Sequence, residues 1–152
     1  MHLVDYLGLL HEAEDGLARG FGLVADGLAD DPDVYFLCHR MADESAHHSR
    51  ELKQFADRYG EKRLSEPQRL EVSLFEDVRP GGLGLLRDLQ DLYMMAHFCQ
   101  ITWMMIGQAA QGARNEELFT LAVSCESEIT RQIKWLNTRM KSAAPMALLI
   151  AD

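Results

Sequence analysis

The sequence predicts an all-α protein, a bundle of four long helices arranged as two antiparallel hairpins joined by a long crossover. Three observations support this prediction. Apolar residues recur at alternating steps of three and four through four long segments, as in helices that keep one stripe against partner helices. Short turns separate the members of each hairpin, whereas the stretch between the hairpins is long and rich in turn-forming residues. The length of 152 residues suits one domain, so we expect a single domain over residues 1–152.

The first helix is expected over about residues 2–28 and the second over about 32–59. Pro32 follows two aspartates and is well placed to open the second helix, because its fixed φ is already helical. Gly60 ends the second helix. Each helix would be about 40 Å long at 1.5 Å per residue. The tight connection between them makes an antiparallel hairpin.

Residues 60–82 form the expected crossover. This stretch contains Pro67, Pro80 and a Gly81-Gly82 pair and shows no sustained helical period. A chain of about 22 residues can span roughly 70 Å when extended, which is enough to cross the whole bundle. We therefore expect the third helix to begin at the end where the second began, and to run parallel to it.

The third helix is expected over about residues 83–112 and the fourth over about 115–142. The turn between them ends at Asn115, a residue type that caps helix N-termini. Pro145 follows the fourth helix, and residues 143–152 form an apolar tail. We expect this tail to fold back on the bundle, and the alternative is a short anchor for a partner protein.

The two hairpins repeat one another at a shift of 84 residues. Six apolar-stripe positions of the second helix fall without a gap on six of the fourth, and a duplicated helical hairpin is the simplest explanation. The pairs are Val34 with Leu118, Cys38 with Ala122, Met41 with Cys125, Ser45 with Ile129, His48 with Gln132, and Leu52 with Leu136.

Four polar residues interrupt the apolar stripes at one level: Glu14, Ser45, His48 and Gln132. A buried charge or amide without a partner costs several kcal/mol. We therefore expect a hydrogen-bonded core network in which Glu14 meets His48, while Ser45 and Gln132 satisfy the remaining donors and acceptors.

The arrangement resembles the ferritin-like superfamily, which includes ferritins, bacterioferritins and rubrerythrins. The resemblance covers residues 2 to about 142. Glu14 precedes the aromatic Phe21 by two helical turns, as the first-helix ligand precedes an aromatic residue in that family. The stretch His48-Ser-Arg-Glu-Leu52, with Phe55 beyond it, resembles the region after the family's second-helix ligand. The stretch Ile133-Lys-Trp135-Leu136 resembles the region after the fourth-helix His of bacterioferritins. The resemblance implies a di-iron carboxylate site, with a Glu from each of two helices and a Glu-x-x-His from each of the others.

Most of that ligand set is absent from this chain. Only Glu14 and His48 match, and the other positions hold Ser45, Ile129, Gln132 and Ala96. Two iron ions need several anionic oxygen ligands to offset their charge. We therefore expect no cofactor, and a degenerate di-iron site.

A reduced metal site is the alternative. Glu44-Ser-Ala-His47 is literally a Glu-x-x-His, but His47 lies roughly 120° off the core axis at 100° per residue and should face outward. A single iron or manganese ion could still be held by Glu14, Glu44 and His48, with His47 or Glu51.

The composition excludes several partners. A net charge of −9 without a basic stripe argues against nucleic acid and anionic membrane surfaces. No run approaches the roughly 20 apolar residues that a membrane span needs, and the first residues do not read as a secretory signal. The three cysteines, Cys38, Cys99 and Cys125, lie on apolar stripes and are expected to be reduced, which favours a cytoplasmic location.

The third helix is apolar well beyond its core stripe. It carries Tyr93-Met94-Met95, His97-Phe98 and Trp103-Met104-Met105. A second apolar face on a helix indicates an interface, so we expect a homodimer through this helix. The alternative is that the crossover and the tail cover that face.

Two functions follow as hypotheses. The first is a non-catalytic binding or assembly module, with a possible protein partner. The second is a metal-binding protein or an iron- or manganese-dependent oxidoreductase that uses a reduced carboxylate and histidine site. The sequence leaves open whether the protein is an enzyme.

Overall fold

The computed structural model describes residues 2–59 and 76–150, and all of its regular structure is α-helical. The four helices are α1 (Leu3–Gly27), α2 (Pro32–Tyr59), α3 (Gly81–Gly112) and α4 (Glu116–Leu149). The predicted all-α class and the helix order are confirmed. Most of the predicted crossover, residues 60–75, lies outside the described residues.

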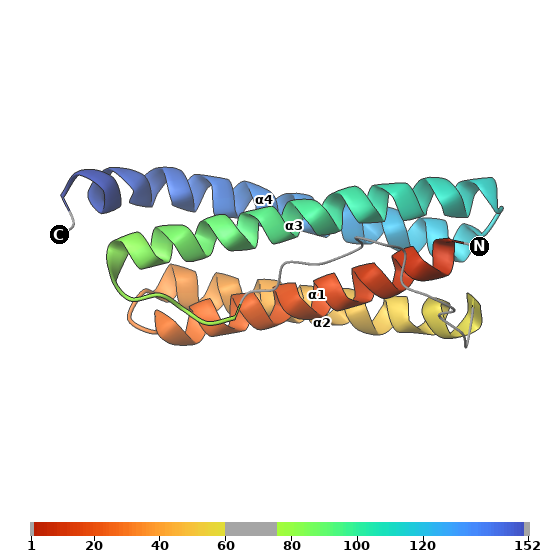
Figure 1. The fold of residues 1–152 in the computed structure, drawn as a ribbon, viewed down its shortest axis with the longest axis horizontal. Coiled ribbons are helices and arrows are strands. Elements are labelled where there is room, and N and C mark those ends of the chain that lie inside the picture. The colour runs from red at the N-terminus through yellow and green to blue at the C-terminus, as the bar shows by residue number, and fades with distance from the viewer. Residues whose placement is uncertain (1, 60–75, 151–152) are drawn as a thin grey trace.

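The helices pack as two hairpins, α1 with α2 and α3 with α4, and the hairpins meet through α1 against α3 and α2 against α4 (Figure 1). Two ion pairs mark the ends of the α2–α4 contact. Arg139 of α4 lies 2.7 Å from Asp31, just before α2, while Arg58 near the end of α2 lies 2.8 Å from Glu117 at the start of α4. Helices α2 and α4 are therefore antiparallel, and α3 runs parallel to α2 as predicted.

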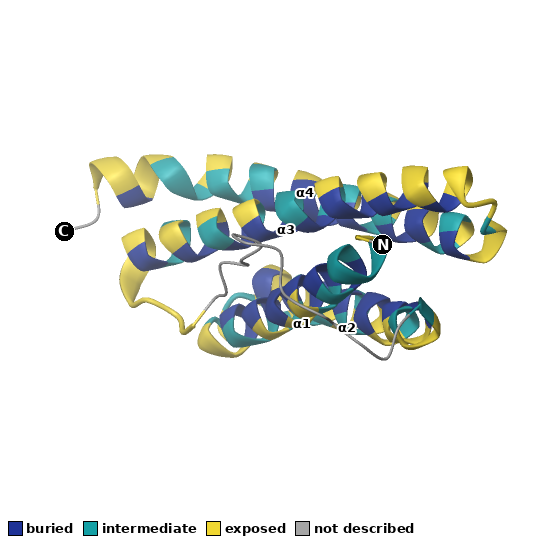
Figure 2. Ribbon diagram, turned by 45° about the vertical axis from the view of Figure 1, so that its right-hand side comes forward, coloured by how far each residue is buried: buried dark blue, intermediate teal, exposed yellow. Residues whose placement is uncertain are grey.

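The core lies between the apolar stripes. Figure 2 shows buried residues along the inward faces of the helices and exposed residues along their outer faces. Every position paired by the internal repeat is buried, the polar Ser45, His48 and Gln132 included. The repeat in the sequence is therefore also a repeat in packing.

Helix α3 begins with a tight turn around its first residues. Gly81 has φ of 75°, in the left-handed region that glycine adopts at little cost. Asp88 reaches back from the next turns, and its carboxylate accepts hydrogen bonds from the backbone N–H of Arg79 at 2.9 Å and from its guanidinium at 2.6 Å. A Cβ at Gly84 would lie 2.7 Å from the carbonyl carbon of Arg79. The turn therefore requires glycine at 84.

Helix α4 begins at the predicted cap. The Asn115 side chain accepts a hydrogen bond from the backbone N–H of Leu118 at 3.0 Å, and its amide donates to the Tyr59 hydroxyl oxygen at 2.5 Å. The cap thus joins the start of α4 to the last residue of α2.

The end of α4 corrects one expectation. The helix does not stop near residue 142 but continues through Pro145 to Leu149, so most of the predicted tail, residues 143–149, is helical. Proline removes the N–H that would bond the Lys141 carbonyl, but its fixed φ is helical, and near a helix end few hydrogen bonds are lost. These residues extend α4 past the start of α3 (Figure 1) instead of folding back, and Leu149 is 83% exposed.

None of the four helices within residues 2–59 and 76–150 combines the length and the apolar character that crossing a membrane requires.

Candidate functional site: a polar centre shared by four helices

Among the residues that the structure describes, Glu14 in the middle of α1 is the most deeply buried charged residue, with 0% of its surface exposed. Its Oε1 atom accepts a hydrogen bond from the indole N–H of Trp103 in α3 at 2.6 Å. The same oxygen lies 3.2 Å from Nδ1 of His48 in α2. Glu14 therefore connects its own helix with both helices that flank it.

His48 extends this connection to the fourth helix. The Nε2 atom of its buried ring lies 2.9 Å from Oε2 of Glu128 in α4, whose side chain is 29% exposed. The ring also meets Trp103 edge-on, with centroids 6.3 Å apart. Trp103, Glu14, His48 and Glu128, which we call the polar centre, thus form one chain of contacts through all four helices.

His48 is the basic residue of this centre, with one carboxyl group at each ring nitrogen. Burial lowers the pKa of His48, but interactions with Cys125 and with Glu14 more than offset that effect and raise it to about 11.

The remaining predicted network residues form a second cluster. The Gln132 amide nitrogen donates to Glu44 Oε2 at 3.2 Å, and it lies 3.4 Å from both the Ser45 hydroxyl and the Met41 carbonyl oxygen. The structure therefore brings Glu14 and His48 together, and places Ser45 and Gln132 with Glu44 instead of with that pair.

The two clusters are equivalent under the internal repeat. A shift of 84 residues carries Glu44 to Glu128 and His48 to Gln132. The contact of His48 with Glu128 and the contact of Gln132 with Glu44 are therefore two versions of one α2–α4 contact. One version uses an imidazole ring, and the other uses a neutral amide.

The three buried cysteines are not poised for chemistry. Burial raises the pKa of Cys99, and the charge of Glu14 adds to this. Burial also raises the pKa of Cys125, although His48 opposes the shift, and burial raises that of Cys38 to about 12. Since the thiolate is the reactive and metal-binding form, all three behave as small apolar side chains at neutral pH.

The residues present do not fit a pair of metal ions. Ser45, Ile129 and Ala96, which stand at expected ligand positions, are buried without offering a carboxylate or imidazole. Both nitrogens of His48 face carboxylates. Among the residues that the structure describes, no group of three or more His, Cys, Asp and Glu side chains is arranged to hold a metal.

The other proposed ligands lie away from the polar centre. Glu44 contacts Gln132 and, at 3.3 Å, Arg40. His47 is exposed, as its angle on the helical wheel predicted, and Glu51 is half-buried. Glu14 and His48 are thus the members of the predicted metal set that meet each other.

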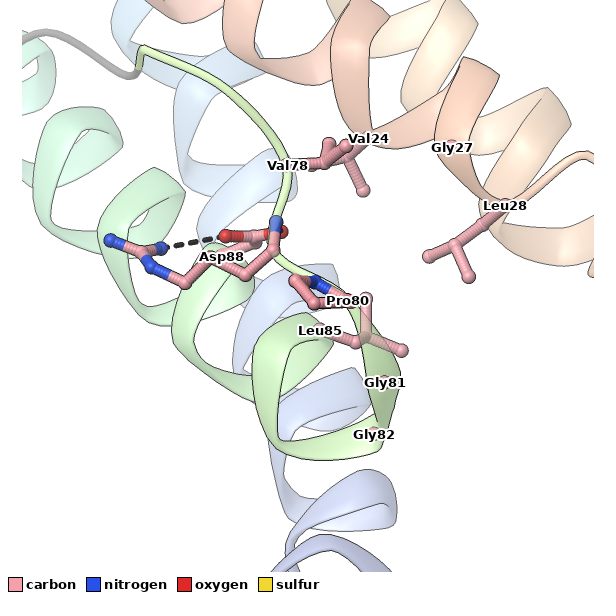
Figure 3. A pocket seen from close by; sticks show the side chains of 10 residues that line it. Val24, Gly27, Leu28, Val78, Pro80, Gly81, Gly82, Leu85 and Asp88 are labelled. Atoms are coloured by element: carbon pink, nitrogen blue, oxygen red, sulfur yellow. Dashed lines mark hydrogen bonds and ion pairs between the residues drawn. The ribbon is translucent and has the colours of Figure 1, made fainter.

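A separate cavity of about 390 Å³ lies at one end of the bundle, between the end of α1 and the start of α3 (Figure 3). Its lining is mostly apolar and includes Val24, Val78 and Leu85, and its carboxylate, Asp88, is paired with Arg79. The rise along α1 from Glu14 to Val24 is about 15 Å at 1.5 Å per residue, so this cavity is not part of the polar centre.

Two members of the polar centre were not foreseen from the sequence. The apolar period places Trp103 on the core stripe of the third helix, although a buried indole N–H usually finds an acceptor. Glu128 was not among the residues expected in the core. The sequence did contain a signal for Glu128, namely its equivalence to Glu44 under the repeat. A second signal is chemical, because the His48 ring needs a partner for its second nitrogen.

No protein-family model matches this chain, and no match is found among the curated proteins or the solved structures.

Proposed function

We propose that this chain is a non-catalytic binding and assembly module, a ferritin-like bundle without a complete di-iron site, that pairs with a second copy of itself through α3. The observation that carries the proposal is the outer face of α3. From Leu92 to Ala113 the sequence contains no Asp, Glu, Lys or Arg, although 26% of the whole chain is charged.

Large apolar side chains stand on that face. Met94 is 64% exposed, Ile101 50% and Met105 40%. Their spacing of seven and four residues places them along one side of the helix. We call these three residues the α3 face.

Electrostatics favours this face for self-association. Two copies that each carry a net charge of −9 repel one another, and a surface free of carboxylates allows the closest approach. Methionine side chains adapt their shape to a partner. A twofold pairing would bring the α3 face of one copy against the same face of the other.

The non-catalytic part of the proposal is supported by the polar centre. One oxygen of Glu14 is matched by the His48 ring and the Trp103 N–H, one oxygen of Glu128 is matched by the same ring, and burial raises the pKa of the nearby Cys125 thiol. The ferritin-like part is supported by the two hairpins, the parallel α2 and α3, and the polar level inside the bundle.

Sedimentation velocity over a range of concentrations tests the pairing. The native chain is expected to be a dimer, and Met94→Glu combined with Ile101→Glu is expected to give a folded monomer with an unchanged helical circular dichroism spectrum. Phe36→Glu is the matched control, because Phe36 is an apolar residue of α2 that is 69% exposed away from the α3 face. A native monomer at all concentrations, or dissociation by Phe36→Glu as well, would refute the proposed interface.

Metal analysis tests the competing oxidoreductase hypothesis. Protein is purified from cells grown with added iron and manganese, and its metal content is measured. Near-stoichiometric metal that disappears in Glu14→Ala and His48→Ala variants would replace our proposal with the metal-dependent one. A folded, metal-free dimer supports the assembly module.

A further inference from the structure

We propose that the ring of His48 is the resident cation of this core: with both nitrogens protonated it occupies the place between Glu14 and Glu128 that a metal ion would otherwise take, so the bundle holds itself together there without metal. This inference goes beyond the assembly function, and it does not depend on the α3 face.

The two ring contacts are the geometric basis for this protonation state. A neutral imidazole has one N–H and one lone pair. Nδ1 lies 3.2 Å from Glu14 Oε1, and Nε2 lies 2.9 Å from Glu128 Oε2. An ionised carboxylate only accepts hydrogen bonds, so a lone pair facing either oxygen at these distances would be repelled. Only the ring with an N–H on each nitrogen satisfies both contacts.

The alternative is a proton on one of the carboxyl groups. Oε1 of Glu14 also accepts the Trp103 N–H at 2.6 Å, so this oxygen already serves as an acceptor, while Oε2 is buried without a hydrogen-bond partner. The Glu128 side chain is 29% exposed and open to water. We assign the proton to the ring, because a proton on either carboxyl group would leave one ring nitrogen without an N–H.

The groups around the ring come from every helix. Helix α1 supplies Glu14, and α4 supplies Glu128 and Cys125. Helix α3 supplies Trp103, which is uncharged, and α2 supplies the His48 ring itself. A metal ion that bound either ring nitrogen would have to displace the proton on that nitrogen and break its contact with a carboxylate, and the centre offers no further carboxylate in return.

The test is nitrogen NMR of a chain in which His48 is the only histidine. The other five, at positions 2, 11, 39, 47 and 97, are replaced by glutamine, and the ring nitrogens are labelled with 15N. At neutral pH both nitrogens are expected to carry a directly bonded proton and to show the shifts of an imidazolium. One nitrogen with the shift of an unprotonated ring would overturn the proposal.

The same sample tests the exclusion of metal. One equivalent of Mn²⁺, which is paramagnetic, is added and the ring signals are followed. They are expected to stay sharp. Saturable broadening that is abolished by Glu14→Gln would show that the centre binds metal, and would refute the inference. This result is independent of the sedimentation experiment, so the two proposals can fail separately.

If the multiple substitution prevents folding, the native chain is used instead. Its His48 signals are identified as the ring signals that shift in Trp103→Phe, because Trp103 meets the His48 ring edge-on. The expected protonation and the effect of Mn²⁺ are the same, and so are the outcomes that refute them.

Discussion

Nε2 of His48 lies 2.9 Å from Oε2 of Glu128, and this ion pair joins α2 to α4 inside the bundle. The repeat supplies its uncharged counterpart, the 3.2 Å hydrogen bond from Gln132 to Glu44. The same α2–α4 contact therefore occurs twice, once with the His48 ring and once with the Gln132 amide, and the contribution of charge can be compared within one protein.

Glu128→Gln should destabilise the bundle more than Glu44→Gln. Each substitution retains an acceptor oxygen, but Glu128 faces the buried His48 ring, whereas the cation that faces Glu44 is Arg40, whose side chain is 70% exposed and screened by water. We expect a loss of about 1–3 kcal/mol in the free energy of unfolding for Glu128→Gln and less than about 1 kcal/mol for Glu44→Gln, measured by urea denaturation. Equal losses would mean that His48 is neutral in the folded protein.

The stability should fall as the pH rises above the ordinary histidine range. The pKa of His48 is raised from 6.5 to about 11, so its stabilising contribution is complete below pH 6.5 and is lost progressively up to about pH 11. The fall is at most about 1.4 kcal/mol per pH unit for one proton.

This pH dependence is best measured between pH 6.5 and about 8.5, below the ordinary cysteine pKa of 9.0, because the buried thiols also respond above it. The free energy of unfolding of the native chain is compared with that of His48→Gln. The difference between the two should shrink as the pH rises. Parallel curves would contradict the assignment.

Gly84→Ala should destabilise the start of α3. Its Cβ would lie 2.7 Å from the carbonyl oxygen of Arg79, which is backbone and cannot rotate away. We expect a loss of about 1–3 kcal/mol. Gly82→Ala is the matched control, since a Cβ there meets nothing within 4 Å, and it should gain up to about 1 kcal/mol from the better helix propensity. The melting temperatures of the two variants are measured by thermal unfolding, and that of Gly84→Ala should be the lower. Similar melting temperatures would contradict the requirement for glycine at position 84.

Asn115→Ala should remove the cap of α4 and cost about 1 kcal/mol. Tyr59→Phe removes only the hydroxyl oxygen that accepts from the Asn115 amide and leaves the cap intact, so it should cost less. Urea denaturation ranks the two variants. The reverse order would assign the main role to the Tyr59 contact.

The fold could be predicted because it depends on the spacing of apolar residues and on turn chemistry. The stripe positions of α2 and α4 are buried as their period required, and Asn115 caps α4 as its residue type suggested. The continuation of α4 past Pro145 was missed because proline usually marks a helix end, and the sequence alone does not reveal that its remaining hydrogen bonds suffice.

The polar centre was only half predictable. The periodic pattern places Glu14 and His48 inside the bundle, but it places Cα atoms and says nothing of how far a side chain reaches. Glu128 lies beside the core stripe, and its long side chain covers the remaining distance to His48. Trp103 satisfies the apolar pattern through its ring, so the pattern could not show that its N–H binds Glu14.

The hydrogen bond from Trp103 to Glu14 also gives the molecule an internal optical probe. The chain has two tryptophans, and Trp103 is fully buried, bonded to a carboxylate and edge-on to an imidazolium. With Trp135 replaced by phenylalanine, the emission of Trp103 would come from the one level where side chains of all four helices meet. The loosening of one hairpin from the other could then be followed by fluorescence without any label.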